Sequence, residues 1–272
     1  MKNEVMVIAE LGWNFMGDMA LAEQMIESAK KAGANVVKFQ YWDPAKLKPG
    51  VWDTDGRREI YEAAKLNATS IKQLIEFSEA CGIDCLFSVF NKEDAAFVKS
   101  LGVNKIKIPS HEVANFELHK YCLEKFDFVI ASIGACSEEE LAAVAEIYSS
   151  AAEGSYSVLH CISAYPCPLE KMNLPRLQLL KKYFGGTVGL SDHSTSTLTG
   201  GFAFGYGARV FEKHFTSNKE LAGRDNKFAL VESELVEYIE IITGASNAGM
   251  FHGAGALDIE QDTINQYRGR WG

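Results

Sequence analysis

The chain has 272 residues, of which 47% are hydrophobic, and its formal net charge is −9 at pH 7. This acidic balance argues against a nucleic-acid partner and against an anionic membrane surface, but a few lysines are enough to hold a small anionic ligand. The longest apolar runs are too short to span a membrane. Six cysteines without a C-x-x-C pair, and a charged start, MKNEVMVIAE, in place of a signal peptide, lead us to expect a cytoplasmic protein.

Short runs rich in Val, Ile and Phe recur along the chain, and amphipathic stretches of helical period separate them. This alternation predicts parallel strands joined by crossover helices. We expect eight strands, at residues 5–10, 36–40, 84–89, 105–109, 127–132, 156–163, 187–192 and 208–215. The simplest α/β fold of this kind is a (β/α)8 TIM barrel, forming a single domain over residues 1–272 with residues 255–272 as a C-terminal tail or linker remnant. A doubly wound open sheet is the alternative, but the first turn, ELGWNFMGD, lacks G-x-G-x-x-G.

Two helix starts are marked by capping-box patterns. Ser70 with Gln73 and Ser137 with Glu140 each place a hydroxyl three residues before a Gln or Glu, so we expect helices to begin there. Residues 41–70 form a connection too long to be a simple turn, which favours a binding loop or lid.

Polar residues interrupt the apolar strands mainly near their C-terminal ends, where barrel enzymes of this type carry their functional groups. We therefore expect these side chains to converge on one mouth of the barrel. They are Glu10, Asn14, Lys38, Gln40, Lys107, Ser110, Glu112, Ser132, Ser163, Tyr165, Ser191, Asp192, His193, Glu212, Lys213 and His214.

The histidines and lysines of this set suggest specific chemistry. His193 and His214 follow neighbouring strands, so they could share one divalent cation completed by water and substrate oxygens, or each could be a hydrogen-bonded structural histidine. Lys38 and Lys107 lie within VVKFQ and KIKIP, where a lysine needs an anionic partner. That partner is a phosphate or carboxylate ligand, bound with help from the hydroxyls of Ser132 and Ser191, or a carboxylate of the chain, from Glu10 or Glu112.

Strand alternation separates the charged triplet of VFEKHF, residues 210–215. Glu212 and His214 share one face, whereas Lys213 lies on the other. If His214 points into the barrel, Glu212 does so one layer deeper, and Lys213 points toward the helices.

Several stretches, in order, resemble those of a known family. They are IAELGWNFMGD, AKKAGANVVKFQ, KIPSHEVANFEL, LHCISAYPCPLEKMNL, GLSDHS and GARVFEKHFT. Over nearly its whole length the chain resembles the sialic acid (N-acetylneuraminate) synthase family, which condenses phosphoenolpyruvate with an N-acylated hexosamine. The pairing of S-D-H with the later E-K-H-F is more specific than any single motif.

The resemblance implies a function and a set of site residues. The product would be a 2-keto-3-deoxy sugar acid, and the partners would be small molecules, phosphoenolpyruvate and an aldose. His193 and His214 would hold a divalent cation, Mn²⁺ or Mg²⁺, while Glu10 or Glu112 would orient or deprotonate the attacking water. Residues implied around phosphoenolpyruvate are Lys38, Lys107, Ser110, Ser132, Ser163 and Ser191. On the sugar side are Glu112, Gln40, Tyr165 and Asp225. We add Glu212 as a carboxylate that either supports the metal ligands or faces the substrate.

The sequence departs from the family's pattern in three places. Phe15 and Met16 replace polar residues after the first strand, which changes the expected acceptor pocket. Arg224 stands in GRD where family members read GPD, which makes a phosphorylated acceptor an alternative. The chain ends at INQYRGRWG, where full-length members continue into an antifreeze-like domain that contacts the partner of a dimer, so a homodimer is left open here.

Two further hypotheses belong to other functional classes. A Schiff-base aldolase or lyase would use Lys38 or Lys107 as a neutral amine without a metal. A non-catalytic barrel would bind a sugar or anion without turnover.

Overall fold

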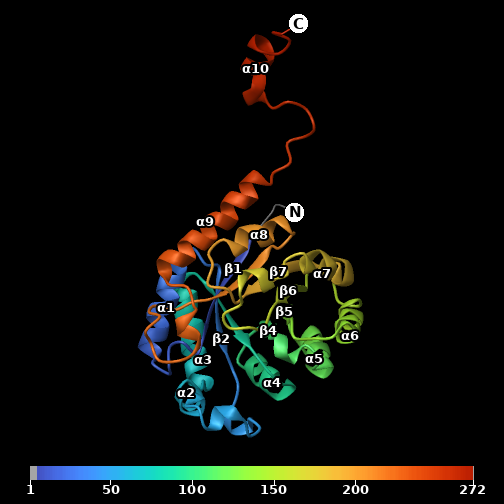
Figure 1. Ribbon diagram of the computed structural model, residues 1–272. Helices are drawn as coiled ribbons and strands as arrows, with labels where there is room; N and C mark the ends of the chain where they lie inside the picture. The colour runs from blue at the N-terminus through green and yellow to red at the C-terminus, as the bar shows by residue number, and fades with distance from the viewer. Residues whose placement is uncertain (1–4, 272) are drawn as a thin grey trace.

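The computed structural model describes residues 5–271, in which eight parallel strands close into a barrel (Figure 1). Each strand pairs with its neighbours in chain order, and β1 closes the barrel against β8. The strands are β1 (Met6–Gly12), β2 (Val36–Gln40), β3 (Asp84–Ser88), β4 (Lys105–Ile108), β5 (Phe128–Ile133), β6 (Tyr156–Cys161), β7 (Thr187–Asp192) and β8 (Val210–His214). The predicted TIM barrel is confirmed.

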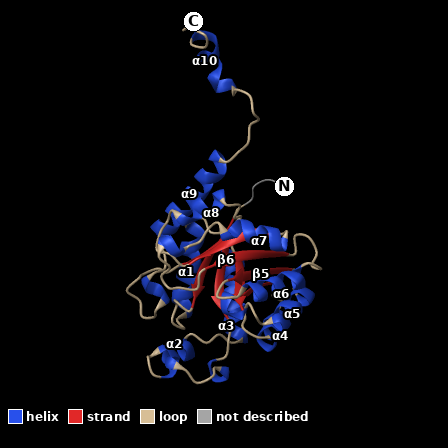
Figure 2. Cartoon of the chain, turned by 45° about the vertical axis from the view of Figure 1, so that its right-hand side comes forward, coloured by secondary structure: helices blue, strands red, loops and turns tan. Residues whose placement is uncertain are grey.

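Helices surround the strands on the outside, as the blue ribbons around the red strands of Figure 2 show. They are α1 (Met19–Lys31), α2 (Arg57–Ala63), α3 (Ala68–Cys81), α4 (Lys92–Ser100), α5 (Phe116–Lys125), α6 (Glu138–Tyr148), α7 (Arg176–Phe184), α8 (Thr199–Gly205) and α9 (Glu232–Ala248). A further helix, α10 (Gln261–Gln266), lies away from the barrel. No helix within residues 5–271 has the length and apolar character needed to cross a membrane.

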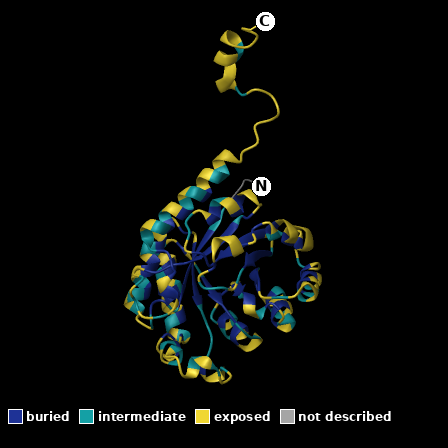
Figure 3. Ribbon diagram, viewed as in Figure 1, coloured by how far each residue is buried: buried dark blue, intermediate teal, exposed yellow. Residues whose placement is uncertain are grey.

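The chain beyond α9 leaves the barrel (Figure 1). From Met250 to Trp271 nearly every residue is exposed, as the yellow arm in Figure 3 shows, and α10 lies in this arm. The stretch expected to be a tail or linker remnant therefore contains a short helix.

The structure corrects two details of the element predictions. The helix expected to begin at Ser70 begins at Ala68, because the Asn67 side chain caps it by accepting from the backbone N–H groups of Thr69 and Ser70. The strand expected over 156–163 ends at Cys161, and the Ile162 carbonyl beyond it accepts a hydrogen bond from a histidine ring. The Ser137–Glu140 capping box is confirmed.

The barrel interior is built in layers, because every second residue of a strand points inward. The lower layer is an apolar plug made of Ile8, Val36, Leu86, Ile130, Leu159 and Val210. Two positions further along the same strands, the next inward residues are polar or ionisable: Glu10, Lys38, Ser88, Ser132, Cys161 and Glu212. The plug therefore closes the barrel below a layer of chemically active groups.

An ion pair on the outer side of the strands corrects one expectation about the mouth. Asp192 points toward the helix layer, because its neighbour Ser191 takes the inward position. There its Oδ2 lies 2.9 Å from Nζ of Lys213, both side chains are fully buried, and Nζ donates to the Ser194 carbonyl at 2.6 Å. Asp192 and Lys213 thus connect β7 to β8 and to the loop after β7.

Asn14, also expected at the mouth, has a structural role, since its Nδ2 donates to the Phe215 carbonyl at 2.8 Å.

Replacing Lys213→Met should lower the free energy of unfolding by about 3 kcal/mol or more, because it leaves the Asp192 carboxylate buried without a counter-charge. Urea unfolding followed by circular dichroism measures this. Lys219→Met breaks a half-exposed pair with Glu234 and should cost about 1 kcal/mol at most. Equal losses in the two variants would contradict the assignment, and Asp192→Asn combined with Lys213→Met should recover much of the stability.

Candidate active site

Four charged side chains from four strands meet just above the apolar plug. Lys38 Nζ lies 2.5 Å from Glu10 Oε2 and 3.8 Å from Glu212 Oε1, while Lys107 Nζ lies 3.1 Å from Glu212 Oε2. All four are buried. Of the two alternatives raised for the lysines, the structure shows the pairing with carboxylates of the chain, which are Glu10 and Glu212 rather than Glu112. An anionic ligand between the lysines stays a prediction.

The cluster shifts the pKa values of its members in opposite directions. Burial by itself would raise the pKa of Glu212, but the ammonium groups of Lys107 and Lys38 outweigh it and lower that pKa to about 2. Burial raises the pKa of Glu10 despite the nearby Lys38, and it lowers the pKa of Lys107 despite Glu212. Glu212 is thus the permanent anion of the cluster.

Hydroxyl groups surround these charges. Lys38 Nζ donates to Ser88 Oγ at 2.7 Å, and Ser191 Oγ donates to Glu212 Oε1 at 3.2 Å. Ser110 and Ser163 are joined by a 2.8 Å hydrogen bond between their hydroxyls. The buried Ser132 Oγ has no partner among the residues that the structure describes. Ser88, Ser110, Ser132 and Ser191 line, with the two lysines, a lower cavity with about 50 Å³ of free space. The predicted site residue Ser163 does not line it and is exposed, touching the site through its bond to Ser110.

His193 and His214 enter the same cavity from the ends of β7 and β8, with ring centroids 5.6 Å apart. A 2.8 Å contact with the Ile162 carbonyl fixes His193 Nδ1 as the donor, which leaves Nε2 free. Burial lowers the pKa of His214 to about 4, so its ring is neutral at pH 7, and its buried Nδ1 makes no hydrogen bond within residues 5–271.

This donor set fits a divalent cation with two protein ligands. Imidazole nitrogens are ligands of Mn²⁺ and related ions, and the buried Nδ1 of His214, which makes no hydrogen bond within residues 5–271, is available to bind one. Within the described part of the chain no group of three or more His, Cys, Asp and Glu side chains could hold an ion. The remaining coordination positions would therefore belong to water and substrate oxygens.

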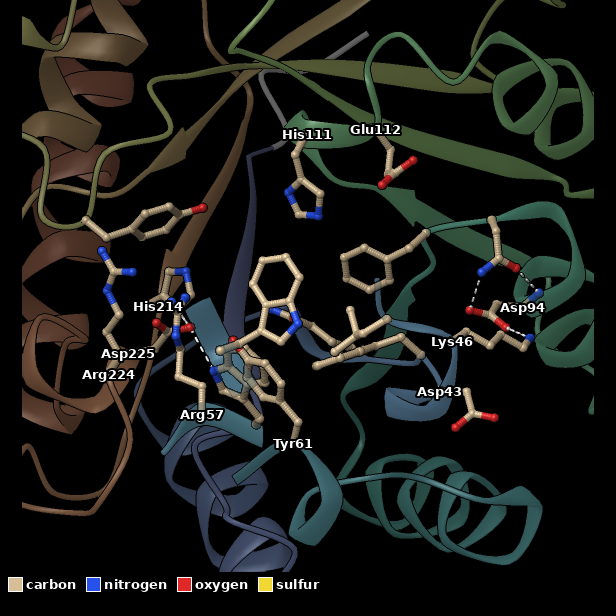
Figure 4. Close-up of a pocket in the computed structure, with 18 residues that line it drawn as sticks. Asp43, Lys46, Arg57, Tyr61, Asp94, His111, Glu112, His214, Arg224 and Asp225 are labelled. Carbon is tan, nitrogen blue, oxygen red and sulfur yellow. Dashed lines mark hydrogen bonds and ion pairs between the residues drawn. The ribbon is translucent and has the colours of Figure 1, made fainter. Parts of the chain in front are cut away.

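A larger upper cavity of about 580 Å³ opens above the histidines (Figure 4). Of the residues expected on the sugar side, Glu112, Gln40, Tyr165 and Asp225 line it, together with His214. Glu212 does not, because it is held in the lower cavity by the lysines. Phe15 lines neither cavity: it is buried against Phe39, so its replacement of a polar residue changes the core and not the pocket.

Aromatic side chains form one wall of the upper cavity. Trp13 stacks on Tyr61 at 4.2 Å, and Trp42 meets both rings edge-on. The Trp13 indole N–H also donates to Asp225 Oδ2 at 2.9 Å, which fixes the ring beside His214. A wall of this kind suits the C–H faces and acyl groups of a sugar derivative.

The long segment after β2 supplies much of this wall, as expected for a binding loop. It carries Trp42, Trp52, Arg57 and Tyr61 into the cavity, and Lys46 anchors it to α4 through a 3.0 Å ion pair with the buried Asp94. At the other end of the cavity, Arg57 and Arg224 lie near His214 and Asp225 (Figure 4).

Sequence reasoning missed Ser88, Trp13, Trp42, Tyr61 and His111. For Ser88 a signal existed, since it follows the inward Leu86 by two positions. Trp13 and Trp42 lie in loops, where no pattern indicates the direction of a side chain, and Tyr61 lies in the short helix α2 within the long connection after β2.

Comparison with known proteins identifies the family of the chain. A sequence model described as the NeuB family matches residues 25–251. The chain is 35% identical to the pseudaminic acid synthase of Campylobacter jejuni, over 96% of this chain and 78% of that one. It is 32% identical to the N,N'-diacetyllegionaminic acid synthase of Legionella pneumophila, over 88% and 71% of the two chains.

A solved structure agrees. The N-acetylneuraminic acid (sialic acid) synthetase of Leptospira borgpetersenii, crystallised in complex with citrate, superimposes with a TM-score of 0.86 at 27% identity, over 96% of this chain and 90% of that one. The chain therefore belongs to the NeuB family, which includes sialic, pseudaminic and legionaminic acid synthases.

Proposed function

We propose that this enzyme condenses phosphoenolpyruvate with an N-acylated aldose, giving a 2-keto-3-deoxy sugar acid and phosphate. C3 of phosphoenolpyruvate attacks the open-chain aldehyde, water adds to C2, and phosphate leaves with cleavage of its C–O bond. The observation that carries the proposal is the meeting of Lys38, Lys107 and the two histidines between a closed apolar plug and an open aromatic cavity.

The lower cavity is the site proposed for phosphoenolpyruvate. Its 50 Å³ holds little more than water, so the anion enters only as Lys38 and Lys107 exchange their internal carboxylates for its phosphate and carboxylate. The hydroxyls of Ser110, Ser132 and Ser191 supply further hydrogen bonds, and Ser163 orients Ser110 through the bond between their hydroxyls. Because the lysines are held in place by Glu10 and Glu212 beforehand, little side-chain entropy is lost on binding.

A cation bound by His193 and His214, which we propose to be Mn²⁺ or Mg²⁺, would supply Lewis acidity at the aldehyde oxygen. The chain's own groups handle the water. Glu10 faces the lower cavity beside Lys38, and burial raises the pKa of its carboxyl group above the ordinary value, which makes it a stronger base. We therefore assign to Glu10 the orientation and deprotonation of the water that adds to C2. Glu112 lines only the upper cavity, where it is placed to contact the acceptor.

The aromatic wall supports an acceptor with apolar substituents such as N-acyl groups. Arg57 and Arg224 favour a second candidate, a phosphorylated acceptor, because two guanidinium groups lie at one end of the same cavity.

We place the reaction in the cytoplasm, where the six cysteines, all unpaired, stay reduced. A homodimer is part of the same proposal, by analogy with the family.

The test is incubation with phosphoenolpyruvate, Mn²⁺ and a panel of N-acylhexosamines with and without a 6-phosphate. We expect phosphate and 2-keto acid in equal amounts, and in ¹⁸O-labelled water the phosphate should stay unlabelled because the C–O bond breaks. Labelled phosphate, or no release with any acceptor from folded protein, would refute the proposal. A pyruvate adduct trapped by borohydride in chelator would instead favour a Schiff-base aldolase.

Changing His193→Ala or His214→Ala should each abolish Mn²⁺-dependent phosphate release, because one imidazole is too weak a site for the ion. Equilibrium dialysis should show the loss of the bound Mn²⁺ directly, while circular dichroism shows a folded barrel. His252→Ala, in the exposed arm, is the matched control and should bind Mn²⁺ as the unaltered protein does. Retention of Mn²⁺ by both active-site variants would exclude the two histidines as ligands.

Changing Lys107→Met should weaken phosphoenolpyruvate binding by about tenfold to a hundredfold, the effect of removing one charged hydrogen bond. Calorimetric titration measures it without turnover. The control is Lys105→Met on the same strand, where the lysine is exposed and pairs with Asp84 outside the cavity. If both variants bind phosphoenolpyruvate equally well, the lower cavity is not its site.

A further inference from the structure

His111 is a polar side chain between the two cavities to which no role has been assigned above. Five residues line both the lower and the upper cavity: Gln40, Phe90, His111, Tyr165 and His214. His111 belongs to the short 3₁₀ turn Ser110–Glu112 that follows β4. Its neighbours divide between the two spaces, since Ser110 lines the lower cavity and Glu112 the upper one. The turn therefore places His111 at the boundary, where the two proposed substrates meet.

The ring of His111 is held in position without using its nitrogens. It stacks on Phe90 with centroids 5.3 Å apart and planes inclined by 24°. No other residue among 5–271 forms a hydrogen bond with the imidazole, in contrast to the buried His119 and His160, which contact Tyr148 and the Met172 carbonyl. Figure 4 shows the ring directed into the cavity, between the His214 end and the Asp94 end.

The surroundings keep this ring neutral. The side chain of His111 is exposed in the barrel mouth, where partial desolvation, followed by the positive charges of Lys107 and Lys38, lowers its pKa below the ordinary value. A neutral imidazole offers one N–H donor and one acceptor nitrogen, so it can bind an oxygen whether that oxygen is a hydroxyl, a carbonyl or an alkoxide.

We propose that His111 binds the acceptor at the boundary of the cavities, hydrogen-bonding an oxygen at or next to its aldehyde carbon and so directing that carbon toward the lower cavity. The inference rests on the proposed function and adds a positioning residue to it. Stacking on Phe90 fixes the plane of the ring, and the hydrogen bond fixes the acceptor relative to the ring. Orientation of this kind lowers the barrier of a bimolecular condensation.

The test compares three variants. His111→Phe keeps an aromatic ring on Phe90 but removes both nitrogens, His111→Gln restores a donor and an acceptor, and His252→Phe makes the same chemical change in the exposed arm. We expect kcat/KM for the best acceptor to fall by about tenfold or more in His111→Phe, with KM for phosphoenolpyruvate changed less than about twofold. His111→Gln should recover part of the loss, and His252→Phe should match the unaltered enzyme.

Binding gives a second readout that needs no turnover. Trp13, Trp42 and Trp52 line the acceptor cavity, so in a Trp271→Phe background the tryptophan fluorescence reports on acceptor binding alone. The acceptor Kd should rise by about tenfold in His111→Phe.

Two results would overturn the inference while leaving the proposed function intact: an active His111→Phe enzyme with unchanged acceptor kcat/KM and Kd, or an equal loss in His111→Phe and His111→Gln. A parallel rise of both substrate KM values would mark the residue as structural and overturn it as well. Inactivity of the unaltered protein with every acceptor would refute the proposed function, and the inference with it.

Discussion

The pairing of two lysines with two carboxylates inside the barrel is the constraint on which the rest of the structure depends. Charges cannot stay buried without partners, and four strands must therefore bring Glu10, Lys38, Lys107 and Glu212 to one level within a few ångströms. The cluster is close to neutral overall, which lets it stand directly on an apolar plug. Its ion pairs can also be exchanged, because an incoming anion can replace a carboxylate as the partner of either lysine. The same interactions therefore stabilise the fold and prepare the proposed substrate site.

The period of two along each strand explains how one sequence serves both purposes. An inward apolar residue in the plug is followed two positions later by an inward polar or ionisable one, while the residues between them pack under the helices. Where a charge falls on the outer side, as with Asp192 and Lys213, it must find its partner there, and it does. Among inward residues, those nearer the start of a strand pack in the plug and most of those two positions later line the lower cavity. Charged residues that point outward, such as Asp192 and Lys213, form structural ion pairs instead.

Much of this could be predicted from the sequence because strand periodicity and helix caps are local. The eight strands, the inward direction of Glu212 and the outward direction of Lys213 all follow from alternation. The prediction that Asp192 lies at the mouth is wrong, because the inward position at the end of β7 belongs to Ser191 and alternation turns Asp192 outward. The aromatic wall could not be predicted, because Trp13 and Trp42 lie in irregular segments and Tyr61 in a short helix, and the directions of all three depend on tertiary packing. A role for His111 could not be predicted from the sequence, because the residue is distinguished only by its position in space, where it lines both cavities.

The closure of β1 against β8 has a consequence for how the enzyme matures. Glu10 comes from the first strand and Glu212 from the last, and Lys38 touches both. A chain still emerging during synthesis has both lysines long before it has the second carboxylate, so the interior of a partly formed barrel carries excess positive charge that favours an open, hydrated state. Only arrival of the final strand neutralises it. Contacts so distant in sequence form slowly, and here the last of them also completes the proposed reaction centre, so a barrel with all four charges in place is one whose folding has finished.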